Sequence, residues 1–169
     1  MKIPRIALAA YGFAILIVIV DQLTKAWVLE GLGLRFEGQS HPILDPVLNI
    51  TLVHNQGVSF GLFGDGSARW LLSVFSAAVA VVLGWWALRA DRRLLITAIG
   101  LIMGGAVGNV IDRIRFGFVV DFLDFSGTGV FPWVFNVADS AITIGVILLI
   151  LDSLLSERAA KVGVAAEKS

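Results

Sequence analysis

Four apolar runs, each close to the length that crosses a lipid bilayer, constrain the fold of this chain more than any other feature. They cover about residues 6–28, 69–88, 94–111 and 138–156. A membrane-spanning helix needs roughly 20 apolar residues. Of the 169 residues, 57% are hydrophobic and 15% are charged, whereas soluble domains are about 25% charged. The sequence therefore predicts an integral membrane protein with four spanning helices.

The first run could be mistaken for a cleaved targeting segment, because Lys2 and Arg5 precede apolar residues that continue to Val20. The run is followed by Asp-Gln-Leu-Thr-Lys at 21–25, and not by small residues spaced for cleavage. We expect this segment to remain attached and to form the first span.

The distribution of Lys and Arg predicts the orientation, since basic residues near span ends favour the cytoplasm. One side of the expected bundle carries Lys2, Arg5, Arg89, Arg92, Arg93, Arg158 and Lys161. The other side carries Arg35, Arg69, Arg113 and Arg115. The second group weakens the bias without reversing it, so both termini are expected in the cytoplasm.

This orientation places two longer connections outside, at residues 30–68 and 112–137. Residues 47–53 alternate as a strand does, and residues 116–125 are partly strand-like before turn signals at Gly127 and Gly129. We expect an all-α membrane bundle of four helices that carries a small extracytoplasmic β platform. Because no linker or repeat interrupts it, residues 1–169 are interpreted as one integral membrane domain, whose tail after Arg158 is expected to fray.

The third run carries glycines at intervals of four, Gly100, Gly104 and Gly108. This spacing places them on one helix face, where another backbone can approach closely. Asn109 and Asp112 lie near the same face and point into whatever the helix packs against. We interpret the glycines as a packing surface.

Aspartates gather at the outer ends of the apolar runs: Asp21, Asp112, Asp121, Asp124 and Asp139. A charge in hydrocarbon costs about 2.5 to 3.5 kcal/mol even on the lenient insertion scale. Carboxylates concentrated at one level of a membrane protein favour either acid/base chemistry or ion transfer.

Two of the polar clusters have an ordinary structural explanation. Asp21 and Lys25, four residues apart with the acid first, suit a helical ion pair that makes insertion tolerable, with substrate positioning as the alternative. Asn55 and Gly57 follow a strand, where such residues commonly form a turn. His54 is interpreted as a turn or interface residue.

The remaining aspartates differ in their neighbours. Asp112 has Arg113 beside it and should stay ionised, which suits a supporting role. Asp121 lies among apolar residues with no adjacent cation, so burial would raise its pKa, as in many catalytic carboxyls. In a strand, Asp124 would face the opposite way from Asp121. Asp139 opens the last helix.

Helix capping gives an ordinary explanation for part of that last cluster, since Asn and Asp are common N-cap residues. Capping would explain either Asn136 or Asp139, but hardly both in so apolar a segment.

Composition excludes several kinds of site. The chain has no Cys, which rules out disulfides, thiolate metal sites and a Cys nucleophile, and His41 and His54 are its only histidines. Lys and Arg together number 13, as do Asp and Glu. The net charge of zero gives no reason to expect a nucleic acid as a partner.

Five motifs in order, from about residue 12 to 155, resemble those of the lipoprotein signal peptidase (type II) family. They are Asp-Gln-Leu-Thr-Lys at 21–25, Asn55-x-Gly57, Gly104-Gly105-Ala106-x-Gly108-Asn109-x-x-Asp112-Arg113, Val119-Val120-Asp121-Phe122 and Phe135-Asn136-x-Ala138-Asp139-Ser140. Each motif alone is a weak indication of the family, but five motifs in this order are highly specific for it. One departure is Val58-Ser59, where the family commonly has two alanines.

The resemblance implies an intramembrane aspartyl endopeptidase of the bacterial inner membrane, with its site toward the extracytoplasmic face. Such enzymes remove the signal peptide from diacylglyceryl-modified prolipoproteins by cutting before the lipidated Cys. By motif position, Asp121 and Asp139 would be the catalytic pair. The motifs also imply supporting residues: Asp21, Lys25, Asn55, Gly57, Gly108, Asn109, Asp112, Arg113, Asn136 and Ala138.

No cofactor or metal is implied, and the expected partners are the prolipoprotein substrates and membrane lipids, with the enzyme as a monomer. Two carboxyls that share a site cannot both ionise cheaply, so they hold one proton between them. The ionised member can activate water while the protonated member donates to the peptide carbonyl. This chemistry needs no nucleophilic side chain.

Two other functions remain open from the residues alone. In a small proton- or ion-coupled transporter subunit, Asp21, Asp112 and Asp139 would relay charge. Against it, the acids gather at one side and no internal repeat is present. In a non-enzymatic assembly factor, the polar residues would only hold helices together.

Overall fold

The computed structural model describes residues 5–57 and 67–167. Its long helices are α1 (Arg5–Ala26), α2 (Ser67–Ala87), α3 (Arg93–Arg115) and α4 (Val137–Glu167). Four segments are long and apolar enough to cross a membrane, namely Ile6–Gly31, Arg69–Ala87, Arg93–Arg115 and Val137–Lys161. The four predicted spans are therefore confirmed, and the chain is a multi-pass membrane protein.

Helix α3 is the centre of the bundle. Of its most apolar stretch 67% is buried, against 22% in each of the other three spans. Glycine makes the close packing possible: a Cβ at Gly100 would lie 2.7 Å from the carbonyl oxygen of Ala10 in α1, and one at Gly104 would lie 2.7 Å from that of Ala14. The predicted packing role of these glycines is confirmed.

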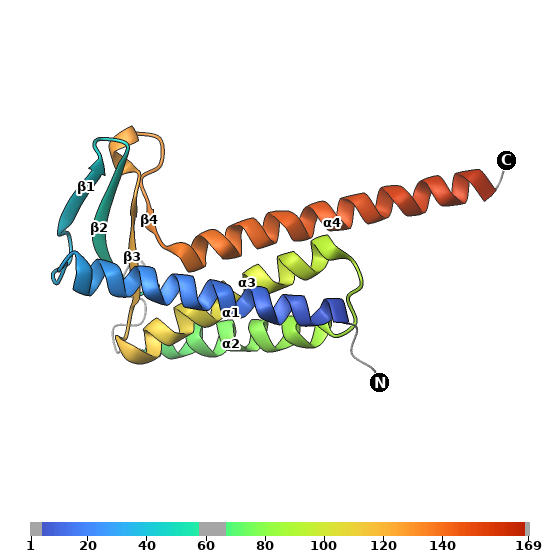
Figure 1. Cartoon of the computed structure of the whole chain (residues 1–169), viewed down its shortest axis with the longest axis horizontal. Coiled ribbons are helices and arrows are strands. Elements are labelled where there is room, and N and C mark those ends of the chain that lie inside the picture. Colours follow the sequence, from blue (N-terminus) through green and yellow to red (C-terminus); the bar gives the residue numbers. More distant parts are fainter. Residues whose placement is uncertain (1–4, 58–66, 168–169) are drawn as a thin grey trace.

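A four-stranded antiparallel sheet stands at one end of the bundle (Figure 1). Its strands, in spatial order, are β1 (Ser40–Leu44), β2 (Leu48–Asn55), β3 (Val119–Asp124) and β4 (Val134–Phe135). The face of the sheet turned toward the end of α1 buries an apolar cluster that includes Val28, Leu34, Leu52, Val120 and Phe122. Because side chains alternate along a strand, Asp121 projects from the other face. The predicted β platform is confirmed.

Several predicted boundaries are wrong. Helix α3 continues to Arg115, so Asp112 and Arg113 lie in its last turns and not in a loop at 112–137. The helix ends there because Gly117, with φ of 86°, turns the chain out of it. The first span continues beyond residue 28 through a π-helical turn, η1 (Trp27–Gly31).

The tail after Arg158 is also helical, as far as Glu167, and not frayed as predicted. Figure 1 shows that this end of α4 extends well past the other helices. A salt bridge of 2.8 Å between Arg92 and the buried carboxylate of Asp152 holds α4 to the start of α3. By sequence, Gly61, Gly64 and Gly66 make the first outer loop a candidate gate. These glycines and the departure at Val58-Ser59 lie outside the described residues.

Candidate active site

Three segments bring polar side chains together where the sheet meets the bundle. They are the end of α3, strand β3 and the start of α4, and the end of β2 completes the site. Asp121 comes from β3 and Asp139 from the first turn of α4. The fold thus brings together two carboxylates that are 18 positions apart in the sequence.

Asp121 is 1% exposed and accepts two hydrogen bonds from amide side chains. Asn55 donates from Nδ2 to Oδ2 over 2.8 Å, and Asn136 donates from Nδ2 to Oδ1 over 2.6 Å. Burial, together with the nearby carboxylate of Asp139, raises the pKa of Asp121 to about 7. The two hydrogen bonds oppose this rise but do not cancel it. The raised pKa predicted from the apolar neighbours is confirmed.

Asp139 is half-buried and is held by the helix that it opens. Its backbone N–H donates to Oδ1 of Asn136 over 2.9 Å, and its own Oδ2 accepts from the backbone N–H of Asn136 over 3.4 Å. This reciprocal pair is a capping box. Asn109 in α3 donates to the other oxygen of Asp139 over 2.8 Å.

Asn136 is the link between the two carboxylates. Its side-chain N–H group contacts Asp121 while its carbonyl oxygen accepts from the backbone of Asp139. The residue is completely buried, so water does not compete for these bonds. The structure therefore gives Asn136 two tasks, capping α4 and orienting Asp121, and explains why both Asn136 and Asp139 are polar in an apolar segment.

Beneath this pair lies a buried charge cluster made of Asp21, Lys25 and Asp112. The Nζ of Lys25 lies 2.8 Å from Asp21 Oδ2 and 2.7 Å from Asp112 Oδ2. All three side chains are at most 2% exposed. The predicted pair of Asp21 and Lys25 is confirmed, but it belongs to a larger group.

Each acid of the charge cluster also fixes the backbone just before one candidate aspartate. Asp112 accepts a 3.0 Å hydrogen bond from the N–H of Val120, and Asp21 accepts one of 3.0 Å from the N–H of Ala138. Val120 precedes Asp121, and Ala138 precedes Asp139. The cluster thus positions both segments.

The cation that pairs with Asp112 is Lys25 and not Arg113, its neighbour in the sequence. Adjacent residues on a helix point about 100° apart, so Asp112 faces Lys25 whereas Arg113 faces the sheet. Arg113 lines an open cavity of about 770 Å³ together with Asp121, Asn55 and Gly57. This places a guanidinium in the same cavity as one candidate carboxylate.

Two glycines of the motifs make room for this arrangement. A Cβ at Gly108 would lie 2.6 Å from Oδ2 of Asp21. Gly57 has φ of 81°, a conformation that favours glycine, and its N–H donates to Oδ1 of Asn55 over 2.8 Å. That bond turns the N–H group of Asn55 toward Asp121.

Asp124 lies apart from the site, as the alternation of β3 predicts. It accepts hydrogen bonds from Thr51 over 2.6 Å and from the backbone of Ser126 over 2.9 Å. Burial alone would raise the pKa of Asp124, but these bonds outweigh it and hold that pKa below its usual value. His54, predicted as a turn or interface residue, lies in β2 and stacks on Phe118 at 4.0 Å between ring centroids.

Sequence reasoning missed Gln22. Its Nε2 donates to Asp112 over 2.9 Å and to Asp21 over 3.1 Å. The signal was its place inside Asp-Gln-Leu-Thr-Lys, as an amide in an apolar run. Within the described residues, no three His, Asp or Glu side chains are grouped as metal ligands would be.

Comparison with known proteins gives the family. The family profile for signal peptidase (SPase) II matches residues 13–155. A lipoprotein signal peptidase of Caulobacter vibrioides is 51% identical over 159 residues, which cover 93% of each chain. One of Methylobacterium radiotolerans is 48% identical over 142 residues, covering 83% of this chain and 82% of the relative.

A solved structure described as a bacterial membrane enzyme, determined at 1.9 Å by the in meso method, superposes with a TM-score of 0.74. It is 32% identical, and the match covers 86% of this chain and 92% of that one. The order of the motifs, the fold and the matches over nearly the whole length agree. The chain therefore belongs to the signal peptidase II family.

Proposed function

We propose that this chain is an aspartic endopeptidase that removes signal peptides from diacylglyceryl-modified prolipoproteins, with Asp121 and Asp139 as its catalytic pair. The observation that carries the proposal is the bridge through Asn136, which joins both aspartates by hydrogen bonds of 2.6 and 2.9 Å. A pair of carboxylates in one site is the arrangement that aspartic peptidases use to activate water.

The environments of the two carboxyls differ, which suits different roles. Asp121 is buried and its pKa is raised to about 7, so near neutral pH it can hold the shared proton. Asp139 is half-buried and lies between hydrogen bonds from Asn109 and the backbone of Asn136. The ionised carboxyl takes a proton from water as the oxygen attacks the peptide carbonyl, and the protonated carboxyl donates to that carbonyl. The C–N bond of the resulting tetrahedral intermediate then breaks as the first carboxyl gives its proton to the leaving amine and the second takes one back from a hydroxyl group, which restores the shared proton.

Supporting residues hold this geometry. Lys25 compensates two buried acids, Asp21 and Asp112, and each of these acids also accepts a hydrogen bond from the backbone just before one catalytic aspartate. Arg113 lies in the cavity beside Asp121, where its positive charge can stabilise negative charge that develops on the substrate carbonyl.

The substrate reaches the pair from the bilayer. A mostly apolar groove of about 240 Å³, lined by Phe131, Phe135, Thr143 and Ile144, runs beside Asp139. Ile144 is 51% exposed on the span α4, where lipid would surround it. A lipid-modified peptide can therefore approach laterally while its acyl chains stay in hydrocarbon, and the surrounding membrane lipids are natural partners.

We place the protein in the bacterial inner membrane with the sheet end of the bundle extracytoplasmic and both termini cytoplasmic. Arg89 and Arg92, which lie between α2 and α3 at the other end, and Arg93, which begins α3, support this orientation. Residues 1–169 act as one integral membrane domain, and as a monomer, since both candidate carboxylates come from the same chain.

The test is cleavage of a diacylglyceryl-modified prolipoprotein by the purified protein. Asp121→Asn and Asp139→Asn should each abolish cleavage while insertion and folding persist. Asp124→Asn is the matched control, because Asp124 lies on the same strand but bonds to Thr51 and Ser126; it should cleave nearly as well as the parent. Full processing by either of the first two variants would contradict the proposal. The unlipidated precursor should be cut poorly.

The transporter alternative is not favoured, because the carboxylates of the described residues form no path across the bundle. The half of the bundle away from the sheet is packed with an apolar cluster that includes Ala10, Leu83, Ile96, Ile99 and Met103. A non-enzymatic assembly factor would predict graded losses of stability and no special role for two aspartates, which the same variants test.

A further inference from the structure

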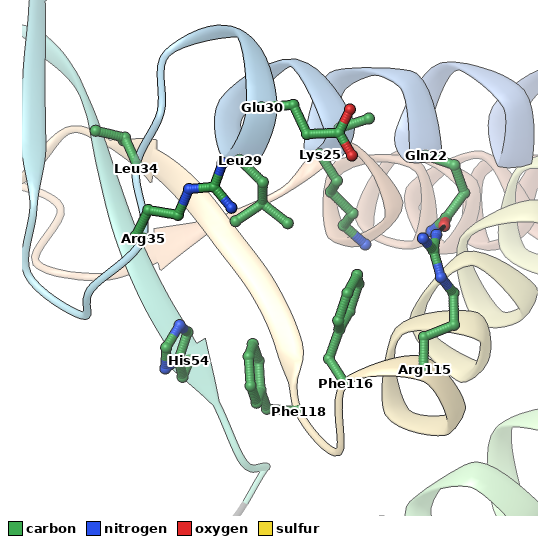
Figure 2. A pocket seen from close by; sticks show the side chains of 11 residues that line it. Gln22, Lys25, Leu29, Glu30, Leu34, Arg35, His54, Arg115, Phe116 and Phe118 are labelled. Atoms are coloured by element: carbon green, nitrogen blue, oxygen red, sulfur yellow. Dashed lines mark hydrogen bonds between the residues drawn. The ribbon is translucent and has the colours of Figure 1, made fainter.

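A second cavity, of about 320 Å³, lies at the sheet end of the bundle, between the end of the first span, the end of α3 and the neighbouring sheet residues. Figure 2 shows Arg35 and Arg115 on opposite sides of it, with the rings of Phe116 and Phe118 between them. Neither Asp121 nor Asp139 lines this cavity, although the supporting residues Lys25 and Gln22 do.

The positions of the lining residues along the membrane spans show how deep this cavity lies in the membrane. Glu30 lies one residue before the end of the first span, and Arg115 is the last residue of the third. Leu29 and Phe116 supply apolar wall beside these charges. The cavity therefore lies at the boundary between hydrocarbon and headgroups, where lipid phosphates are the most abundant anions.

The charged groups of this cavity are available to a ligand. Among the side chains that the structure describes, in residues 6–57 and 69–161, the only salt bridges join Lys25 to Asp21 and Asp112, Arg92 to Asp152, and Lys161 to Glu157. Arg35, Arg115 and Glu30 thus form no salt bridge with a described residue. A guanidinium has five N–H donors in a planar fork that matches phosphate oxygens.

Lys25 also lines the cavity but is not available in the same way. Its ammonium has three donors, and these are directed at Asp21, Asp112 and Asn109, the last over 3.4 Å. Recognition of an anion is therefore left to the two arginines. Glu30 is the one carboxylate of the lining, and it suits a positively charged amine.

We propose that this cavity binds the phosphoethanolamine headgroup of a membrane phospholipid. Arg35 and Arg115 bind the phosphate, and Glu30 accepts hydrogen bonds from the ammonium group. The aromatic walls contact the glycerol and the first carbons of the chains. This inference goes beyond the proposed peptidase activity, because it concerns a resident lipid and a different cavity.

The site is connected to the charge cluster. Arg115 donates to Oε1 of Gln22 over 3.2 Å, and the amide group of Gln22 donates to Asp112 and Asp21. A phosphate that holds Arg115 would therefore restrain Gln22 as well. Bound lipid should stabilise the folded protein, since a ligand that binds only the folded state raises its stability.

The experiment uses the full chain in uncharged maltoside micelles and titrates three short-chain lipids: phosphatidylethanolamine, phosphatidylglycerol and diacylglycerol. Native mass spectrometry measures retention, and the thermal midpoint measures stabilisation. Phosphatidylethanolamine should bind most tightly, phosphatidylglycerol more weakly, and diacylglycerol not at all. Free phosphoethanolamine should bind far more weakly than the lipid; equal affinity would assign the cavity to a water-soluble ligand and overturn the proposal.

Variants test the recognition of the phosphate and of the amine separately. Arg35→Gln and Arg115→Gln should each weaken both phospholipids about 10-fold or more, the loss expected for one charge-assisted hydrogen bond. Glu30→Gln should weaken only phosphatidylethanolamine. Arg89→Gln is the matched control at the other end of the bundle, where the guanidinium lies over Trp85, and should bind like the parent.

Two results would overturn the assignment: diacylglycerol retained as well as phosphatidylethanolamine, or parental affinity in both arginine variants. Equal loss of both phospholipids in Glu30→Gln would overturn the part that concerns the amine. The thermal midpoint of each variant is first measured without lipid. Lipid affinities are then compared among the variants whose midpoint without lipid matches that of Arg89→Gln. Because binding is measured without a peptide substrate, failure here leaves the peptidase proposal standing.

Discussion

The carboxylate of Asp21, in the first helix, accepts a 3.0 Å hydrogen bond from the backbone N–H of Ala138, in the last. Asp112 makes the matching 3.0 Å contact with the N–H of Val120. Each bond ends on the residue just before a candidate catalytic aspartate. Lys25 lies between these two acids. This one buried ammonium group therefore sets how strand β3 and the start of α4 are placed relative to each other.

Replacing the shared cation tests this dependence. Lys25→Met keeps the volume and removes the charge, which leaves two buried acids without compensation. Breaking a buried ion pair in this way costs roughly 3 to 5 kcal/mol. We expect a lower thermal midpoint in micelles and a large loss of cleavage. Lys161→Met, at an exposed pair with Glu157, is the matched control and should change neither; a parental midpoint in Lys25→Met would refute the role given to Lys25.

Gly108 tests how tightly α1 and α3 must approach. A Cβ there would lie 2.6 Å from Oδ2 of Asp21, so Gly108→Ala must displace that carboxylate. We expect lower stability together with reduced cleavage. Gly12→Ala in α1 is the control: its Cβ would meet nothing within 4 Å. Alanine is favoured over glycine in a helix by about 0.5 to 1 kcal/mol, so the control should unfold at the same or a higher temperature.

Much of the fold was predictable from the sequence, because apolar length and strand alternation are local signals. The four spans follow from the length of the apolar runs. The platform and the opposite orientations of Asp121 and Asp124 follow from strand alternation. The ends of the helices were not predictable in this way. Helix α3 passes through Asp112 because its carboxylate finds Lys25 in the core, which makes a charge at that position tolerable.

The residues of the candidate site also fall into those that the sequence predicts and those that it does not. The raised pKa of Asp121 followed from its apolar neighbours, and the family resemblance selected Asp139. The roles of Asn136 and Gln22 could not be read from spacing. Their amides act between segments that lie far apart in the sequence: Gln22 reaches Asp112 across 90 positions and Asn136 reaches Asp121 across 15.

Asn136 combines two functions that substitution can separate. Ser keeps a side-chain oxygen that can cap α4 but lacks the N–H group that contacts Asp121. Asn136→Ser should therefore lose most cleavage at a modest cost in stability. Asn136→Ala loses the cap as well, which costs about 0.5 to 2 kcal/mol more. Near-parental cleavage by Asn136→Ser, measured with the lipidated substrate, would show that the bridge to Asp121 is dispensable.

The pH profile of cleavage tests the shared proton. With the pKa of Asp121 at about 7, the pair loses its proton as the pH rises above that value. A pair with both members ionised has no acid to donate to the substrate carbonyl. We expect kcat/KM to fall on the alkaline side of about pH 7. A profile that stays flat from about pH 6 to 9 would contradict protonation of Asp121.

Stability should depend on pH through the same group, with a sign opposite to that of most acids. The pKa of Asp121 is about 7 in the folded chain and 3.8 in the unfolded chain. Between these values the folded state binds more protons, so the free energy of unfolding falls as the pH rises. At about 1.4 kcal/mol per pKa unit, the total is of the order of a few kcal/mol.

Two variants isolate that contribution. Asp121→Asn cannot titrate, so its thermal midpoint should fall less than that of the parent between pH 5 and 8. Asp124, whose pKa is held below its usual value, contributes with the ordinary sign: its stabilisation is present above the unfolded value and is lost as the pH falls through the folded one. Asp124→Asn should therefore keep the parental loss between pH 5 and 8 and differ only in acid. If Asp121→Asn and the parent lose the same number of degrees between pH 5 and 8, burial does not hold the proton on Asp121.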